Sequence, residues 1–149
     1  MKSERPSLLR SQRGFTLIEL MVVVVILGIL AAVVVPRILD RPEEAKRTKA
    51  AVDIKGIEQA LAMYKLDNGF YPTTDQGLQS LVSKPEIGRI PTHYRDGGYL
   101  KRLPVDPWGN EYVFLSPGSQ GDVDISSLGG DGEPGGDGNN ADINSWEIQ

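Results

Sequence analysis

The chain reads GFTLIELMVVVVILGILAAVVV from Gly14 to Val35. Fifteen of the 21 residues from Phe15 to Val35 are Phe, Leu, Ile or Val. The same stretch contains a single acidic residue, Glu19. A helix of that length measures about 31 Å at about 1.5 Å per residue, which is enough to cross the hydrocarbon core of a bilayer. The stretch therefore predicts a long apolar helix that is transmembrane over residues 15–35.

Glu19 is the residue of this stretch that opposes insertion. A carboxylate costs about 2.5–3.5 kcal/mol at the centre of a membrane helix, while each large aliphatic residue returns about 0.3–0.6 kcal/mol. Fifteen such residues return about 4.5–9 kcal/mol, so the helix still inserts. A carboxylate in this position indicates a function, and we expect its partner to be a cation held in the membrane.

The residues before Gly14 are basic, with Lys2, Arg5, Arg10 and Arg13 against Glu4. This positive flank predicts an N-terminus inside the cytoplasm and a C-terminal domain outside it. Two other interpretations of residues 1–35 are a cleaved secretory signal and a plain membrane anchor. The apolar run is longer than the usual signal core of about 7–15 residues, and a charge inside it fits a signal poorly.

Length and charge limit the remainder of the chain. The 149 residues allow one modest domain after the apolar helix. From Phe15 onward the formal net charge is −7, which argues against nucleic-acid binding. The chain contains no cysteine. An exported domain of this size without disulfides is expected to depend on a metal or on assembly with neighbours.

Residues 36–67 continue the helix in amphipathic form. Pro36 removes a backbone donor, so we expect a kink or a loosened turn near it, helped by Gly28. The apolar stripe of this half consists of Ala50, Ile54, Ile57, Leu61 and Tyr64, broadened by Val52, Ala60 and Met63. Glu43 and Arg47 stand at i,i+4, a spacing that suits an exposed helix. Asn68-Gly69 predicts its end, with Gly69 as a left-handed cap.

Residues 68–149 predict a globular part with a small sheet. Strands are expected over residues 111–115 and 123–128, separated by turn residues. They would bury four side chains against the helical stripe, namely Tyr112, Phe114, Val123 and Ile125. A long helix packed on a small antiparallel sheet is an α+β fold.

The acidic, glycine-rich segment over residues 122–142 has two interpretations. Its carboxylates, amides and turned carbonyls offer the hard oxygen donors that Ca²⁺ takes in sets of about 6–8, and it lacks the His and Cys that favour zinc. The alternative is a disordered acidic loop. Ile143, Trp146 and Ile148 indicate that the chain packs again after the loop, which favours a closed one.

The run from Gly14 to Glu19, placed after a short basic leader, resembles the processing site of the type IV pilin superfamily. The resemblance implies that a prepilin peptidase removes residues 1–14 by cutting after Gly14, and that Phe15 becomes the N-methylated N-terminus. It also implies an assembly role for Glu19, whose carboxylate would meet the terminal amine of a neighbouring subunit.

Four further motifs resemble, in order, the family of major pseudopilins of type II secretion systems (the G subunit). They are YPTTDQGL at 71–78, GYL at 98–100, LPVDPWGN at 103–110 and SLGGDG at 127–132. The resemblance implies a type IV pilin-like α+β fold, with a transmembrane first half of the long helix and a C-terminal metal-binding loop.

The resemblance also implies a Ca²⁺ site in that loop. The implied ligands are the Leu128 carbonyl with Asp131, Glu133, Asp137 and Asn139. This chain departs from the family pattern, which has aspartates where residues 138–140 read Gly-Asn-Asn. The second carboxylate ligand is therefore either Asp137 or Asp142, and Asn139 or Asn140 would serve through an amide oxygen.

The implied function is structural. The chain would be the major subunit of a helical homopolymer, the pseudopilus, that drives type II protein secretion across the outer membrane. It would wait as a single-pass protein in the inner membrane of a Gram-negative bacterium, with its C-terminus in the periplasm. Its partners would be itself, minor pseudopilins, an inner-membrane assembly platform and the prepilin peptidase, and indirectly the secretin and the exoprotein cargo.

No P-loop and no nucleophile–base pattern stands in the sequence, so we do not expect an enzyme. Two alternatives remain within the superfamily, a type IV pilin and a minor pseudopilin at a filament tip. A third, from another class, is a membrane-anchored periplasmic domain that binds ligands through Trp108 and Trp146.

Overall fold

The computed structural model describes residues 14–148, and the side chains of all of these except 34–41. Of the leader predicted over residues 1–14, all but Gly14 lie outside the described residues. The chain divides into two units, Met1–Leu39 and Asp40–Gln149, which are taken in turn below.

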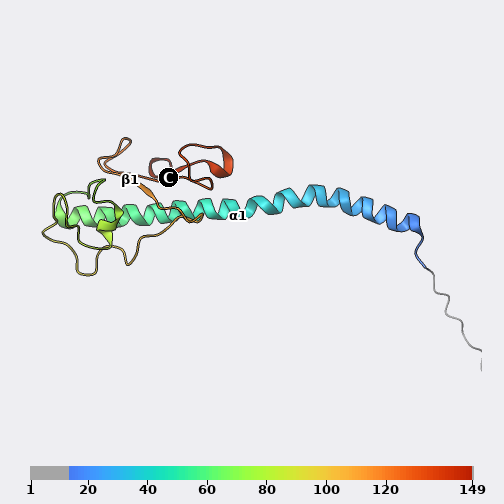
Figure 1. Cartoon of the computed structure of the whole chain (residues 1–149), viewed down its shortest axis with the longest axis horizontal. Coiled ribbons are helices and arrows are strands. Elements are labelled where there is room, and N and C mark those ends of the chain that lie inside the picture. The colour runs from blue at the N-terminus through green and yellow to red at the C-terminus, as the bar shows by residue number, and fades with distance from the viewer. Residues whose placement is uncertain (1–13, 149) are drawn as a thin grey trace, which may run out of the picture. The chain divides into compact units, whose positions relative to one another are not determined.

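Helix α1 runs from Leu17 to Asn68 and is the principal element of the chain (Figure 1). It is assigned as one helix through Pro36, where the sequence predicts a loosened turn. Its end is the predicted one, because Gly69 takes a φ of 83° and donates its N–H to the Lys65 carbonyl at 2.7 Å. A left-handed glycine that closes such a bond is a common helix terminus.

The first unit exposes its apolar side chains. The large hydrophobic residues between Phe15 and Val33 are each between 50% and 81% exposed. Within the described residues, no helix was found to have both the length and the apolar character that crossing a membrane requires. The exposed side chains leave a continuous apolar surface that this unit does not cover itself.

The second unit contains a three-stranded antiparallel sheet in the order β1-β2-β3. The strands are β1 (Val113–Leu115), β2 (Asp124–Ser127) and β3 (Ile143–Asn144). Phe114 is opposite Ile125 in the first pairing, and Ser127 is opposite Ile143 in the second. Two strands are confirmed, each shorter than predicted, while the sequence did not predict β3. Three short 3₁₀ helices complete the unit: η1 (Leu78–Leu81), η2 (Gly138–Asn140) and η3 (Ser145–Glu147).

The core of this unit forms between the sheet and the predicted stripe of α1. The stripe residues Ala50, Ile54, Ile57, Ala60, Leu61 and Tyr64 are all buried, and they form one cluster with Tyr112, Phe114 and Ile125. Val123 is only partly buried against that cluster. The segments coloured orange to red, which include the sheet, lie alongside the teal part of α1 (Figure 1).

The predicted broadening of the stripe is wrong at two positions. Val52 is 65% exposed and Met63 is 47% exposed. Val52 stands two residues from both Ala50 and Ile54, which is about 200° around the helix at about 100° per residue. It therefore faces away from the sheet, and the buried stripe is narrower than the sequence count indicated.

Truncation within the stripe tests this packing. Ile54 is fully buried, whereas Leu66, on the same helix, is 84% exposed. We expect Ile54→Ala to lower the free energy of unfolding by about 2–5 kcal/mol, because it leaves a cavity under the sheet. Leu66→Ala should change it by no more than about 0.5 kcal/mol. Urea unfolding of the detergent-solubilised chain, followed by tryptophan fluorescence, measures both, and equal losses would contradict the assigned core.

Candidate functional site

The start of α1 binds the Glu19 carboxylate within the chain. Oε2 of Glu19 accepts a hydrogen bond from the Thr16 backbone N–H at 3.0 Å and another from the Thr16 hydroxyl at 3.2 Å. The Glu19 N–H donates in return to Thr16 Oγ1 at 3.3 Å. This is a reciprocal capping box, which satisfies backbone donors that a helix start would otherwise leave open.

The capping box changes the expectation for Glu19. The predicted partner of Glu19 was a cation, but Thr-x-x-Glu at 16–19 is also the pattern of a capping box. Both hydrogen bonds to the carboxylate end on Oε2, so the described residues supply no partner to Oε1. Within the described part of the chain, Glu19 therefore has one hydrogen-bonded carboxylate oxygen and one that is available to another group.

The predicted processing residues lie ahead of the helix. Gly14 and Phe15 precede α1, which begins at Leu17, and Phe15 is 81% exposed. Among the described residues, no heavy atom would lie within 4 Å of a Cβ added at Gly14. The Gly14–Phe15 peptide bond therefore lies before the helix, next to an exposed side chain.

The five predicted ligands are spread along the glycine-rich loop that joins β2 to β3. Leu128 is half-buried directly after β2, and Oδ1 of Asp131 accepts the Glu133 N–H at 3.2 Å. Asp137 and Asn139 are exposed at η2. Across the described residues, no group of three or more His, Cys, Asp or Glu side chains is gathered closely enough to hold a metal ion.

The loop does fold back on itself around the carbonyl of Asn140. A Cβ added at Gly129 would lie 2.7 Å from Asn140 O, and one added at Gly136 would lie 2.6 Å from it. Both glycines have positive φ, of 67° and 82°. Only glycine fits at two such positions without strain, so the loop's entry, middle and exit meet at one carbonyl.

Asp142, at the end of this loop, has one hydrogen-bonded and one buried carboxylate oxygen. Its Oδ2 accepts the Gly135 N–H at 2.9 Å, and its own N–H donates to the Gly135 carbonyl at 3.2 Å. Its Oδ1 is buried and has no hydrogen-bond partner. A buried carboxylate oxygen without a partner is costly and requires an explanation.

The entry to the loop is held by the buried Asp106. Its Oδ1 accepts the N–H groups of Trp108 at 3.1 Å and Asn110 at 2.7 Å, and its Oδ2 accepts the Ser127 hydroxyl at 2.8 Å. Asn110 in turn donates through Nδ2 to the Gly129 carbonyl at 3.5 Å. The Pro107–Asn110 turn is thereby connected to the first residues of the loop.

Glu43 and Arg47 both have partners other than each other. Glu43 accepts the Lys46 ammonium at 2.8 Å and the Trp108 indole N–H at 3.0 Å, and these two hydrogen bonds lower the pKa of its carboxyl. Arg47 donates through Nη1 to the Ala141 carbonyl at 2.6 Å. The i,i+4 spacing alone did not predict these contacts, because both long-range partners come from the C-terminal third of the chain.

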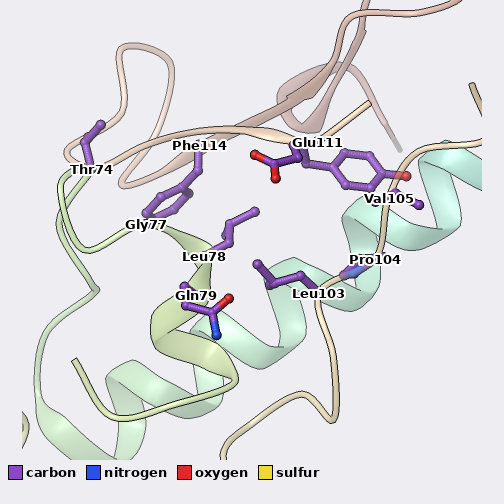
Figure 2. A pocket seen from close by; sticks show the side chains of 10 residues that line it. Thr74, Gly77, Leu78, Gln79, Leu103, Pro104, Val105, Glu111 and Phe114 are labelled. Carbon is purple, nitrogen blue, oxygen red and sulfur yellow. The ribbon is translucent and has the colours of Figure 1, made fainter. Parts of the chain in front are cut away.

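A shallow hollow of about 380 Å³ lies between η1, β1 and the segment before Val105. Figure 2 shows Leu78, Leu103 and Phe114 around it, with Gln79 and Glu111 nearby. Its titratable groups are Glu111 and Tyr112, and burial raises the pKa of the Tyr112 hydroxyl. That hydroxyl donates to Asp53 Oδ2 at 3.0 Å, which joins the residue before β1 to α1.

Two family models match this chain. The model described as type II secretion system (T2SS), protein G, matches residues 37–146, and the prokaryotic N-terminal methylation motif matches residues 9–35. The two matches follow each other along the chain and together cover nearly all of it.

Relatives of known name match over almost their full length. The chain is 60% identical over 141 residues to type II secretion system core protein G of Vibrio cholerae, covering 95% of this chain and 96% of that protein. It is 59% identical over 138 residues to the protein of the same name from Pseudomonas aeruginosa, covering 93% and 97%. The crystal structure of the major pseudopilin from the type 2 secretion system of enterohaemorrhagic Escherichia coli matches with a TM-score of 0.67 at 47% identity, covering 76% of this chain and 96% of that one.

The capping box at Thr16 is open to a direct test. Thr16→Val removes the hydroxyl but keeps the side-chain shape, so we expect the first turn of α1 to lose about 0.5–2 kcal/mol of local stability. Thr48→Val is the matched control, because that hydroxyl donates only to the Glu44 carbonyl of its own helix at 3.0 Å. Amide hydrogen exchange at Glu19 in detergent micelles should accelerate in the first variant alone, and unchanged exchange there would contradict the capping role.

Proposed function

This chain belongs to the type II secretion system protein G family, and on that basis we propose that it is the structural major subunit that polymerises into a helical pseudopilus. Growth of this filament would drive type II protein secretion across the outer membrane. The family consists of structural pseudopilins and is not an enzyme family.

The observation that carries this proposal is that the first half of α1 exposes its apolar side chains and includes Glu19, only one of whose carboxylate oxygens is hydrogen-bonded. The large side chains from Phe15 to Val33 are at least 50% exposed, so they need a cover that the first unit does not provide. A bilayer covers them before assembly, and the same helix from other copies covers them in the filament. One surface thus serves storage in the membrane and polymerisation.

Cleavage after Gly14 supplies the cation that Glu19 lacks. While the peptide bond is intact, the nitrogen of Phe15 is a neutral amide, and after cleavage it becomes an ammonium group. In the filament this ammonium of one copy would meet the free Oε1 of Glu19 in another. Each charge then offsets the desolvation cost of the other, which makes the pair favourable only on assembly.

The localisation and the partners follow from the same proposal. Residues 15–35 would span the inner membrane of a Gram-negative bacterium, with the second unit in the periplasm. The methylation motif supports N-methylation of Phe15 after the prepilin peptidase has acted. The filament would then engage minor pseudopilins, the inner-membrane assembly platform and the secretin, and through the secretin the exoprotein cargo.

The other functions considered have less support. The relatives that match over at least 93% of this chain are named core protein G, which favours the major subunit over a type IV pilin or a tip subunit. A binding domain that uses Trp108 as a platform is disfavoured, because that indole is partly buried and its N–H is engaged by Glu43 at 3.0 Å.

The kinds of donor in the glycine-rich loop support a proposed Ca²⁺ site. Its donors are all hard oxygens, and Asp142 Oδ1 is a buried acceptor without a partner. Asp142 would therefore be the second carboxylate ligand in place of the exposed Asp137. The Leu128 carbonyl and the Asp131 carboxylate would join it. The Glu133 carboxylate and an amide oxygen of Asn139 or Asn140 would complete the shell. A bound Ca²⁺ would supply positive charge and crosslink the loop.

Removal of the Glu19 carboxylate tests assembly. Glu19→Ala should still insert in the membrane, but it leaves the Phe15 ammonium of a neighbour unpaired, at about 3–5 kcal/mol per contact. We expect few or no filaments in electron micrographs of cells that overproduce this variant, and loss of secretion. Asp75→Ala, which removes an exposed acid, is the control. Normal filaments and normal secretion from Glu19→Ala would count against the pairing.

Two matched substitutions test the cation site. Asp142→Asn should weaken Ca²⁺ binding about tenfold or more, because ligand charge tunes affinity in such sites, whereas Asp137→Asn should have little effect. Calorimetric titration of the mature chain in detergent measures both. In the unsubstituted chain, Ca²⁺ at about 100 times its dissociation constant should add about 2.7 kcal/mol to the free energy of unfolding.

The outcomes separate the assignments. Loss of binding in Asp137→Asn with full binding in Asp142→Asn would reverse the choice between the two carboxylates. If the unsubstituted chain gives no heat of binding with Ca²⁺ and its melting temperature does not shift when chelator is added, calcium binding is excluded.

A further inference from the structure

Two side chains one turn apart on α1 reach the C-terminal third of the chain: Arg47 contacts the glycine-rich loop, and Glu43 contacts the turn at Pro107–Asn110 beside it. Arg47 Nη1 donates to the Ala141 carbonyl at 2.6 Å, near the end of the loop. Glu43 Oε2 accepts the Trp108 indole N–H at 3.0 Å. These contacts join residues 94 and 65 positions apart in the sequence. Both side chains belong to the second unit, so they form part of its own packing.

Trp108 packs against the glycine-rich loop and also donates a hydrogen bond to Glu43. A Cβ added at Gly130 would lie 3.2 Å from Trp108 Nε1 and 3.2 Å from Asn140 Oδ1. The indole edge therefore backs the loop entry, while its N–H points to the helix. Lys46 bonds the same Glu43 carboxylate at 2.8 Å, which holds that carboxylate in place for the indole.

Arg47 holds the peptide unit next to Asp142. Its acceptor is the carbonyl of Ala141, and this carbonyl belongs to the peptide bond that leads into Asp142. The preceding carbonyl, of Asn140, is enclosed by Gly129 and Gly136. With one carbonyl enclosed and the next one bonded to a guanidinium, the backbone around Asp142 has little freedom to rotate. The unpartnered Oδ1 is kept buried as a result.

We propose that Arg47 is a positioning residue for the cation site, a helix side chain that holds the Ala141–Asp142 peptide so that the Asp142 carboxylate faces the bound ion. The inference rests on the proposed Ca²⁺ site. It adds that the ion and the first turns of the second unit's helix stabilise each other, because Arg47 makes its bond only when the loop is closed. By linkage, the free energy by which Arg47 stabilises the closed loop also strengthens the binding of the cation.

Simple electrostatics predicts the opposite effect of Arg47. A guanidinium close to a divalent cation repels it, so loss of the positive charge should strengthen Ca²⁺ binding. A positioning role predicts that the same loss weakens binding, since the Ala141 carbonyl is left free and the loop opens. The sign of the change therefore distinguishes a positioning arginine from a bystander.

The test compares two methionine substitutions on one helix. Arg47→Met keeps an unbranched apolar stem and removes the donors and the charge. Lys49→Met removes an equal charge two residues away, where the ammonium pairs only with Asp53 of the same helix. Calcium titration of the mature full-length chain in detergent micelles, by calorimetry, gives the affinities. We expect Arg47→Met to weaken binding about fivefold or more, the low end of typical coupling between sites, and Lys49→Met to leave it within about twofold.

A second readout does not depend on the ion. With chelator present, the Asp142 amide should exchange with solvent faster in Arg47→Met than in the unsubstituted chain, because its bond to the Gly135 carbonyl opens more often. Arg47→Lys keeps a donor and the charge, and it should recover part of the affinity and of the protection.

Equal or tighter calcium binding in Arg47→Met, with unchanged exchange at Asp142, would overturn the positioning role and leave the cation site intact. Absence of any calcium response in the unsubstituted chain would overturn both the site and this role. The two failures are thus told apart by the unsubstituted chain alone.

Discussion

An apolar surface that carries one acid is the constraint on which the rest of this molecule depends. The first unit exposes every large side chain from Phe15 to Val33 and places Glu19 among them. Thr16 satisfies one carboxylate oxygen and leaves the other open. Lipid or another copy of the chain would cover such a surface, which is why a structural polymer is the function that fits.

The second unit has few means of stabilisation. It has no cysteine, and its sheet has only three short strands. Its stability comes from the stripe of α1 under Phe114 and Ile125 and from the buried Asp106. The hydrogen bond from Arg47 to the glycine-rich loop and the one from Trp108 to Glu43 add to it. In this view the loop is an additional fastening of the sheet to the helix, and a bound cation would tighten it.

The parts that followed from sequence are those that depend on local periodicity. Ile54, Ile57, Leu61 and Tyr64 repeat at helical spacing and are buried, and Gly69 ends α1 as expected. Val52 and Met63 were wrongly added to the stripe because they are apolar, although the helical spacing of Val52 from Ala50 and Ile54 places it on another face. Strand β3 is two residues long, too short to show an alternating pattern. The orientation of Asp142 and the reach of Arg47 to Ala141 depend on contacts between distant segments, which spacing along the chain does not encode.

A cryo-electron microscopy reconstruction of the assembled filament would test the central claim most directly, through the distance from Glu19 to the nearest Phe15 nitrogen of another copy. The account predicts a separation of about 4 Å or less, the range of an ion pair. A carboxylate that keeps only its own Thr16 as partner, with every neighbouring terminal nitrogen farther than a Debye length of about 8 Å, would contradict it.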